Sequence, residues 1–169
     1  MPTKYNGGVG VQVYTDGVCH WWGETETHDE VYLVSFNLSN EVFVKTFIPS
    51  SMDGIDSRLV FRHLSVINGS IGWILNYKGT TIFHISVLGE VGAKESWIKL
   101  FIVGPLLSVE HPIGVGKKGD IFFRKKDNQL ARFNLITQKI EELGVKGDRC
   151  CCPIMVYEKS LLPIEGINS

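Results

Sequence analysis

The residues that most resemble a reaction site are three closely spaced glycines, Gly114, Gly116 and Gly119, in the string G-V-G-K-K-G. This spacing matches the G-x-G-x-x-G fingerprint of dinucleotide-binding sites, and Glu141 follows about 20 residues later, where such sites carry an acidic residue. A dinucleotide site needs the glycines between a strand and a helix, so that the amino end of the helix faces the pyrophosphate. Here I-F-F-R-K at Ile121–Lys125 follows, and it predicts a strand. We therefore predict a hairpin turn and no bound cofactor.

Histidine and cysteine, the usual ligands of zinc, are not clustered in a way that suits a metal. Cys19 and His20 are adjacent, so on a strand their side chains point to opposite faces. Residues 150–152 are consecutive cysteines, without a paired C-x-x-C spacing or a disulfide framework. The histidines are scattered along the chain, at His20, His28, His63, His84 and His111. We predict no metal site.

Acidic residues that could act as a general base lie in predicted turns, at Asp16, Asp120 and Glu158. In a turn, an aspartate side chain satisfies backbone amides. A general base needs a nucleophile within reach, and the sequence offers none beside these residues. We therefore predict no catalytic residues and expect that the chain is not an enzyme.

Charged residues gather in two stretches. Residues 117–132 hold six lysines and arginines against Asp120 and Asp127, and Glu24–Glu30 is acidic. For both stretches we favour solvated surface, and the alternative for both is a contact with a partner protein. With a net charge of −1 over 169 residues, we expect no general attraction to nucleic acid or membrane.

No targeting segment is visible in the sequence. The first ten residues, M-P-T-K-Y-N-G-G-V-G, lack the apolar core of a signal peptide. The longest uncharged apolar run, residues 100–109, is about half of the roughly 20 residues that span a bilayer. We therefore expect a cytoplasmic or nuclear protein.

Residues 59–105 predict four short strands that form one antiparallel sheet. The pair Asn68-Gly69 lies between the first two strands, and both residue types tolerate the positive φ that a type I′ hairpin turn requires. Lys78-Gly79 marks the next turn. The predicted strands are Phe61–Ile67, Ile71–Tyr77, Thr81–Leu88 and Trp97–Val103.

The same outline recurs on both sides of this stretch. Gly17, Gly69 and Gly119, each in a predicted turn, are separated by 52 and 50 residues. Each copy also contains a strand that ends in a turn, at F-N-L-S-N-E (36–41), I-S-V-L-G-E (85–90) and F-N-L-I-T-Q-K (133–139). The flanking strands are predicted at Val11–Tyr14, Val18–Trp22, Val31–Leu38, Val42–Ile48, Ile121–Arg124, Leu130–Leu135 and Lys139–Leu143, and a fourth copy begins at Met155.

A repeat of about 50 residues with four strands is typical of a kelch-type propeller blade. We therefore predict an all-β fold: a partial kelch-like β-propeller of about three four-stranded antiparallel blades plus the start of a fourth, in one domain over residues 1–169. Trp21, Trp73 and Trp97 lie in predicted strands, and we expect them in the core between blades. Trp22 must face away from Trp21, so we expect it at a blade surface or groove.

Several strings resemble the F-box-associated interaction domain of plant F-box proteins, the kelch-like group that includes S-locus F-box proteins. They are D-G-V-C-H-W-W (16–22), Y-L-V-S-F-N-L-S-N-E-V-F (32–43), L-N-Y-K-G-T-T-I-F-H-I-S (75–86), E-S-W-I-K-L (95–100) and S-L-L-P (160–163), so the resemblance covers nearly the whole chain. In that family a helical F-box precedes the propeller and docks the Skp adaptor of a cullin-RING ubiquitin ligase, while the propeller holds the protein to be ubiquitinated. No F-box segment precedes Tyr14 here.

The resemblance implies a non-enzymatic module that recognises substrates for an SCF-type ubiquitin ligase. Skp and cullin would bind only a full-length form that carries an F-box, and the alternative is an independent kelch-like scaffold or truncated decoy without a ligase role. The substrate protein would bind through rim loops, because these vary freely on a rigid core. No binding residue is predicted within the candidate loops Gly23–Glu30, Pro49–Arg58, Gly89–Glu95, Val109–Lys118 and Gly144–Arg149. An open stack of blades also leaves an apolar face exposed, so we expect the chain to self-associate.

Overall fold

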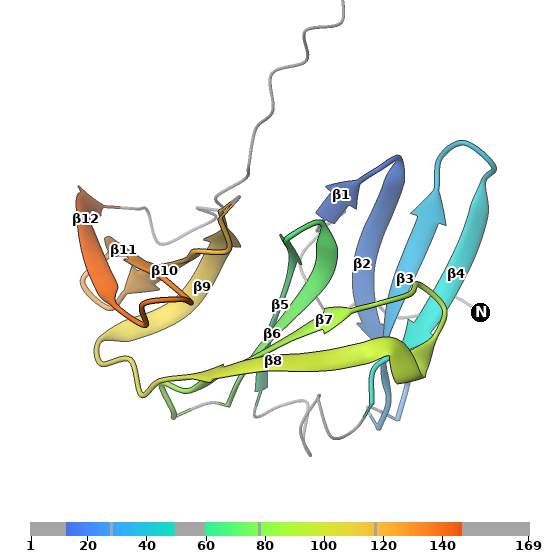
Figure 1. Ribbon diagram of the computed structural model, residues 1–169. Coiled ribbons are helices and arrows are strands. Elements are labelled where there is room, and N and C mark those ends of the chain that lie inside the picture. Colours follow the sequence, from blue (N-terminus) through green and yellow to red (C-terminus); the bar gives the residue numbers. More distant parts are fainter. Residues whose placement is uncertain (1–12, 28, 50–59, 78, 117, 147–169) are drawn as a thin grey trace, which may run out of the picture.

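The fold consists of three four-stranded antiparallel sheets that follow one another along the chain (Figure 1). The computed structural model describes residues 13–27, 29–49, 60–77, 79–116 and 118–146. In each sheet the four strands are hydrogen-bonded in chain order. The first sheet holds β1 (Val13–Thr15), β2 (Val18–Glu24), β3 (Val31–Asn37) and β4 (Val42–Phe47). The second holds β5 (Val60–Ile67), β6 (Ser70–Tyr77), β7 (Phe83–Leu88) and β8 (Trp97–Val103), and the third β9 (Val109–Val115), β10 (Ile121–Lys125), β11 (Gln129–Phe133) and β12 (Ile140–Lys146).

The sheets are arranged like successive blades of a propeller. The first strand of each sheet contacts the first strand of the next, β1 with β5 and β5 with β9. The fourth strands, β4, β8 and β12, are edge strands, each hydrogen-bonded within its sheet only to the third. The described strands form no closed barrel. The predicted all-β, three-bladed architecture is thus confirmed, while the expected fourth copy lies outside the described residues.

The predicted repeat is confirmed by its turns. Asp16 and Gly17 have φ values of 50° and 77°, and Asn68 and Gly69 have 49° and 79°. Both pairs are two-residue hairpin turns between the first and second strands of their sheets. The third copy of this connection is longer and contains Gly119, with φ of 82°.

The G-x-G-x-x-G string lies at this third connection and forms a β-hairpin turn, as predicted. The Gly116 amide donates to the Asp120 carbonyl at 2.8 Å, and the Gly119 amide donates to the Gly116 carbonyl at 3.0 Å. β10 begins at Ile121, directly after the turn. No helix follows these glycines, so the described turn lacks the feature that would hold a pyrophosphate.

One strand was not predicted. We expected a loop over Val109–Lys118, but β9 occupies Val109–Val115 and pairs with β10. Pro112 has no amide to donate, and the pairing of β9 with β10 shifts register twice. An edge strand tolerates such a proline, and β9 is the edge of the third sheet. A second expected loop, Gly144–Arg149, is also wrong in part, because β12 extends through Lys146.

Two apolar layers hold the sheets together. The layer between the first and second sheets contains Val13, Val31, Leu33, Ile48, Leu64, Ile71, Trp73, Leu88 and Trp97. The layer between the second and third sheets contains Ile67, Ile74, Phe83, Ile85, Val103, Val109, Val115, Ile121, Phe123 and Phe133. The second sheet therefore contributes both of its faces to the core, because successive side chains of a strand point in opposite directions.

The tryptophans of β2 are placed the other way round from the prediction. Trp22 packs against the first apolar layer and contacts Trp73. Trp21 lies on the opposite face of the first sheet, where its ring is 6.2 Å from that of Phe43. Trp73 and Trp97 are buried, as expected. The sequence shows that Trp21 and Trp22 face apart, but it does not show which face of β2 meets the second sheet.

Hydrogen bonds also fasten the second sheet to the first. The Trp97 indole Nε1–H donates to the Phe47 carbonyl at 3.1 Å, and the Gly92 amide donates to Thr46 Oγ1 at 2.7 Å. Both donors come from β8 or the connection before it, and both acceptors lie on β4. The expected loop Gly89–Glu95 contains no strand, but the short 3-10 helix η2 (Lys94–Ser96) begins within it, and its Gly92 contacts the neighbouring sheet.

Candidate functional site

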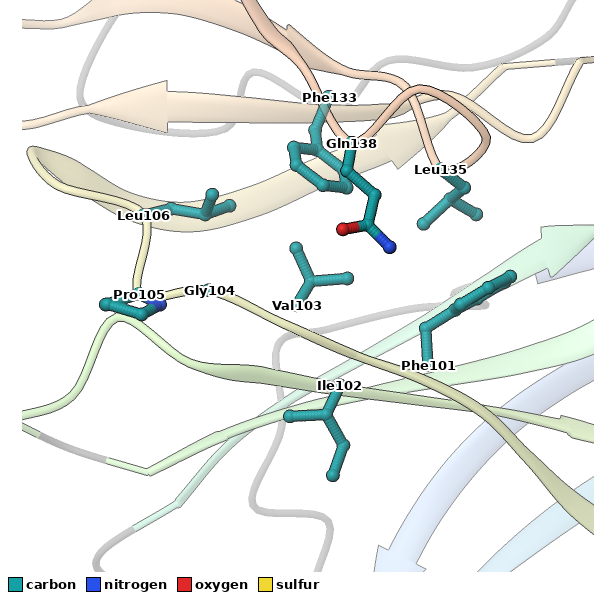
Figure 2. Close-up of a pocket in the computed structure, with 9 residues that line it drawn as sticks. All are labelled: Phe101, Ile102, Val103, Gly104, Pro105, Leu106, Phe133, Leu135 and Gln138. Atoms are coloured by element: carbon teal, nitrogen blue, oxygen red, sulfur yellow. The ribbon is translucent and has the colours of Figure 1, made fainter.

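One hollow on the described surface lies between the second and third sheets. It is a groove of about 230 Å³, which we call the first groove (Figure 2). One wall comes from the end of β8 and the residues after it, and the other comes from β11 and the turn that follows. Its lining residues are Phe101, Ile102, Val103, Gly104, Pro105, Leu106, Phe133, Leu135 and Gln138.

The β8 wall depends on a glycine. Gly104 has φ of 122°, and a Cβ added there would lie 2.4 Å from the Thr81 carbonyl oxygen. Directly beyond it, the Leu106 amide donates to that same carbonyl at 3.0 Å. The chain can therefore turn so closely past Thr81 only because residue 104 has no side chain. This turn brings Leu106 into the lining of the groove together with Phe133 (Figure 2).

The other wall is a hydrogen-bonded turn that starts at Asn134. The Asn134 side-chain Oδ1 accepts from the amides of Ile136 and Thr137, at 2.9 and 2.8 Å. Its carbonyl accepts from the Gln138 amide at 2.8 Å, with Gln138 at φ of 56°. This conformation directs the Gln138 amide group into the groove above Val103 (Figure 2). Gln138 is the one lining side chain of the first groove that has both a donor and an acceptor.

A second groove, of about 330 Å³, lies on the opposite face of the second sheet. Its lining combines apolar side chains with Tyr77, His84, Ser86 and Lys99. The His84 and Tyr77 rings meet edge to face at 5.8 Å. Burial lowers the pKa of His84 below its ordinary value, and the nearby Lys99 ammonium lowers it further. His84 is therefore neutral at physiological pH, and Lys99 carries the positive charge of this groove.

β8 separates the two grooves and is unusually apolar for an outer strand. Ile98, Leu100, Phe101 and Ile102 are 55%, 39%, 40% and 69% exposed. We call these four residues the β8 surface. A register shift between Ile85 and Ser86 of β7 bends the pairing with β8 beside Leu100. An exposed apolar edge strand of this kind offers both backbone hydrogen bonds and side-chain contacts to an extended segment of another chain.

The sequence contains a signal for this surface that we did not use. W-I-K-L-F-I-V at Trp97–Val103 has almost no alternation between polar and apolar residues, although it forms an edge strand. The corresponding strand of the third sheet, I-E-E-L-G-V-K at Ile140–Lys146, is broken up by charges and a glycine. None of the five predicted loops contains a residue of the β8 surface, so the expectation of binding through rim loops does not point to it.

The two charged stretches are tied into the fold to different degrees. The expected loop Gly23–Glu30 is wrong at its start, because Gly23 and Glu24 belong to β2. Within the acidic stretch, hydrogen bonds from Thr27 and Thr25 lower the pKa of Asp29. In the basic stretch, Lys118 and Lys126 are exposed, as expected for solvated surface. Arg124 is an exception, because its side chain is 8% exposed and forms an ion pair with Glu110 at 2.9 Å. The Pro49–Arg58 loop lies almost entirely outside the described residues.

The residues considered for metal binding are separated by the fold. His20 is buried, with its Nδ1 2.8 Å from Ser35 Oγ, and Cys19 lies on the other face of β2. In the described part of the chain, no three His, Cys, Asp or Glu side chains gather closely enough to hold a metal ion. Nor does that part contain a helix long and apolar enough to cross a membrane. The consecutive cysteines at 150–152 lie outside it.

The two grooves and the β8 surface form one continuous candidate site for a protein partner. Phe101 and Ile102 line both grooves, so the apolar surface passes over β8 from one face of the second sheet to the other. Its chemistry is recognition by apolar contact, with Gln138 and Lys99 as the polar groups that can orient a ligand. Comparison of the chain with protein-family models, with curated proteins and with solved structures gives no match.

Proposed function

We propose that this chain is a protein-binding module that holds a partner along β8. The observation that carries the proposal is the exposed apolar β8 surface with a groove on each side. Large exposed apolar patches on a folded chain mark interaction sites. The occupant that fits best is an extended segment that adds to the free edge of β8 as a further strand.

The positions of the two grooves suggest which side chains of the bound segment each groove would accept. Successive side chains of an added strand point to opposite faces of the sheet. One side chain would therefore enter the first groove, beside Leu106 and Phe133, and the next would enter the second groove, beside Tyr77 and Lys99. The first groove suits an apolar side chain, and the Lys99 ammonium favours an acidic group in the second. The partner segment would alternate accordingly.

We place this module in ubiquitin-dependent protein degradation, as the substrate-recognition portion of an SCF-type E3 ubiquitin ligase. The support is the resemblance of five sequence strings to the F-box-associated domain, together with a propeller-like all-β fold. In a full-length form with an F-box, the Skp adaptor and cullin would bind the F-box while the grooves hold the substrate. Such a protein would act in the cytoplasm or nucleus. The alternative is a kelch-like scaffold or decoy that binds its partner without a ligase.

Affinity purification of the native protein from its source tissue tests the ligase role. A ligase subunit brings down a Skp adaptor and a cullin, and the proteins that it binds become longer-lived when it is depleted. A scaffold brings down partners without the adaptor, and their lifetimes do not change. The size of the native polypeptide, measured with an antibody against residues 121–135, shows in the same experiment whether an F-box accompanies this chain.

A pair of matched variants tests the site itself. Ile102→Asp introduces a charge at a residue that lines both grooves and whose side chain is already 69% exposed, so we expect the chain to stay folded but to lose its partners. Leu38→Asp is the control, because Leu38 is 51% exposed in the turn between β3 and β4, away from β8. If Ile102→Asp captures the same proteins as the unmodified chain, binding does not take place along β8.

A further inference from the structure

The face of the first sheet that points away from the second sheet is aromatic. Residues paired across neighbouring strands share a face, and Tyr14, Cys19, Phe36 and Phe43 form one such row. Trp21 lies on the same side, and its ring is 6.2 Å from that of Phe43, which in turn is 4.4 Å from the Phe36 ring. Tyr14 is 63% exposed and Phe43 is 64% exposed. We call this surface the open face.

In the second and third sheets, the residues equivalent to those of the open face are buried against a neighbouring sheet. Trp21, Trp73 and Phe123 each lie four residues after the turn glycine of their sheets, Gly17, Gly69 and Gly119. Trp73 is fully buried against the first sheet, and Phe123 is fully buried against the second, with its ring 4.8 Å from that of Phe83. The open face is thus the first copy of a surface that another antiparallel sheet covers in both later copies.

Two further positions of the repeat show the same difference in burial between the first sheet and the later two. Two residues after the turn glycine, Ile71 and Ile121 are buried under the preceding sheet, whereas Cys19 is only half-buried. The residue paired with each of these on the third strand follows the same rule. In the third sheet Phe133 pairs with Ile121 and is buried, while its counterpart Phe36, paired with Cys19, is half-buried. In the second sheet Leu88, one residue beyond the pair of Gly72 with Val87, is buried as well. The open face is therefore built to pack against a sheet.

The outer face of the third sheet, at the opposite end of the stack, is charged and so is not complementary to the aromatic open face. The outer face of the third sheet carries ion pairs that cross its strands, Arg124 with Glu110 and Arg132 with Glu141. The carboxylate side chains of these pairs are 47% and 62% exposed. Covering them with an aromatic surface would remove charged groups from water without new partners, which is unfavourable. The described sheet surface that suits the open face is the open face of another molecule.

We propose that two copies of this chain pair through their open faces in a two-fold symmetric dimer. Strands about 4.8 Å apart and about 3.3 Å of rise per residue give each face roughly 20 by 20 Å. The corrugated surfaces of two faces bury on the order of 1,000 Å², at the lower limit for a specific interface, so we expect a reversible dimer and not a permanent one. Lys45 also lies on the open face, two residues from Phe43 and with its ammonium over the Tyr32 ring, but β4 is the edge strand, so its long side chain can carry the charge past the edge of the sheet into water.

Sedimentation velocity of the 169-residue chain over a hundredfold range of concentration tests the dimer. The expected mass rises from 18.9 kDa to twice that value as the concentration increases. Phe43→Glu is expected to raise the dissociation constant at least tenfold, without lowering the unfolding midpoint of the dilute protein, because Phe43 is already exposed. Leu107→Glu is the matched control, since Leu107 is 82% exposed on the connection from β8 to β9, and it is expected to leave the dimer unchanged.

Alkylation of Cys19, followed by peptide mapping, gives a second readout. Cys19 lies between Tyr14 and Phe36 in a row of the open face, so its alkylation is expected to slow severalfold at concentrations where the dimer forms. A chain that stays monomeric throughout the range, or a dimer that Phe43→Glu does not weaken, overturns the proposal. Slow alkylation that occurs only in an extract of the source tissue, with the purified chain monomeric, also overturns it and shows that a different protein covers the face.

Discussion

The indole rings of Trp22 and Trp73 meet edge to face, with centroids 5.9 Å apart and planes at 80°. The guanidinium of Arg62 lies over the Trp22 ring at 5.2 Å from its centroid. This arrangement joins β2 of the first sheet to β5 and β6 of the second. Edge-to-face pairs and cation–π contacts both add stability to the burial of the rings. Trp22 is therefore part of the interface between the first two sheets.

Trp22→Ala is expected to lower the free energy of unfolding by about 2–4 kcal/mol, because it removes a large side chain from a packed interface and leaves a cavity beside Trp73. Urea unfolding followed by far-UV circular dichroism measures the change. Val145→Ala on β12 is the control, since Val145 is 54% exposed and its truncation is expected to cost less than about 0.5 kcal/mol. Equal effects of the two substitutions would show that Trp22 does not pack between the sheets.

Substitution of two glycines with positive φ, Gly69 and Gly104, distinguishes the cost of a strained backbone conformation from the cost of a steric clash. Gly69→Ala meets no atom within 4 Å, so its cost is that of a left-handed backbone, about 1–2 kcal/mol. Gly104→Ala adds a Cβ 2.4 Å from the backbone oxygen of Thr81, and we expect it to cost more than about 3 kcal/mol. Thermal unfolding of both variants under the same conditions compares them. A cost for Gly104→Ala no greater than for Gly69→Ala would mean that the turn before the first groove moves freely.

Much of the fold could be predicted because the residue types at its turns identify them without any tertiary information. Asp16-Gly17 and Asn68-Gly69 require positive φ at both positions, and few residue types other than Gly, Asn and Asp allow this. Their spacing then defines the repeat and the order of the strands. The strand ends were not predictable in the same way: the third strand ends at Asn37 in the first sheet but at Leu88 in the second, two residues later within the aligned strings.

Other features depend on tertiary contacts that no short string reveals. β9 was missed because Glu110, His111 and Pro112 separate its apolar residues, and only the pairing with β10 shows that it is a strand. The order of Trp21 and Trp22 was wrong because adjacent residues of the same type carry no sign of which face is covered. The grooves were missed because each takes its walls from segments far apart in sequence, such as Leu106 and Gln138.

The turn after β11 offers a test of the first groove that does not alter its apolar lining. Asn134→Ala removes the hydrogen bonds to the Ile136 and Thr137 amides, and we expect a loss of about 1 kcal/mol together with freedom of Gln138 to leave the groove. Asn37→Ala is the matched control, because Asn37 Oδ1 accepts from the Ser39 amide at 2.9 Å in the equivalent turn of the first sheet.

Both asparagine variants should lose similar stability in urea unfolding, and only Asn134→Ala should bind partners more weakly. Capture of the partner proteins with each immobilised variant measures that difference. Equal partner binding by the two variants at equal stability would show that Gln138 has no part in recognition.

Stability is expected to depend on pH through His20. Burial lowers the pKa of His20 below its ordinary value of 6.5, so the folded chain holds the neutral imidazole beside Ser35. Above about pH 6.5 both the folded and unfolded states are neutral at this residue, and its contribution to stability is complete. As the pH falls below that value, the unfolded chain gains a proton that the folded chain does not, so the free energy of unfolding decreases.

His20→Gln keeps a side chain that can hydrogen-bond to Ser35 but removes the titration. We expect the unmodified chain to lose more stability than His20→Gln between about pH 7.5 and about pH 5.5, a range in which most aspartates and glutamates stay ionised. His84, whose pKa is also lowered, is present in both proteins and leaves a smaller pH dependence in the variant. Urea unfolding at the two pH values measures the difference, and identical losses would mean that water reaches His20 in the folded chain and that the first two sheets separate at this point.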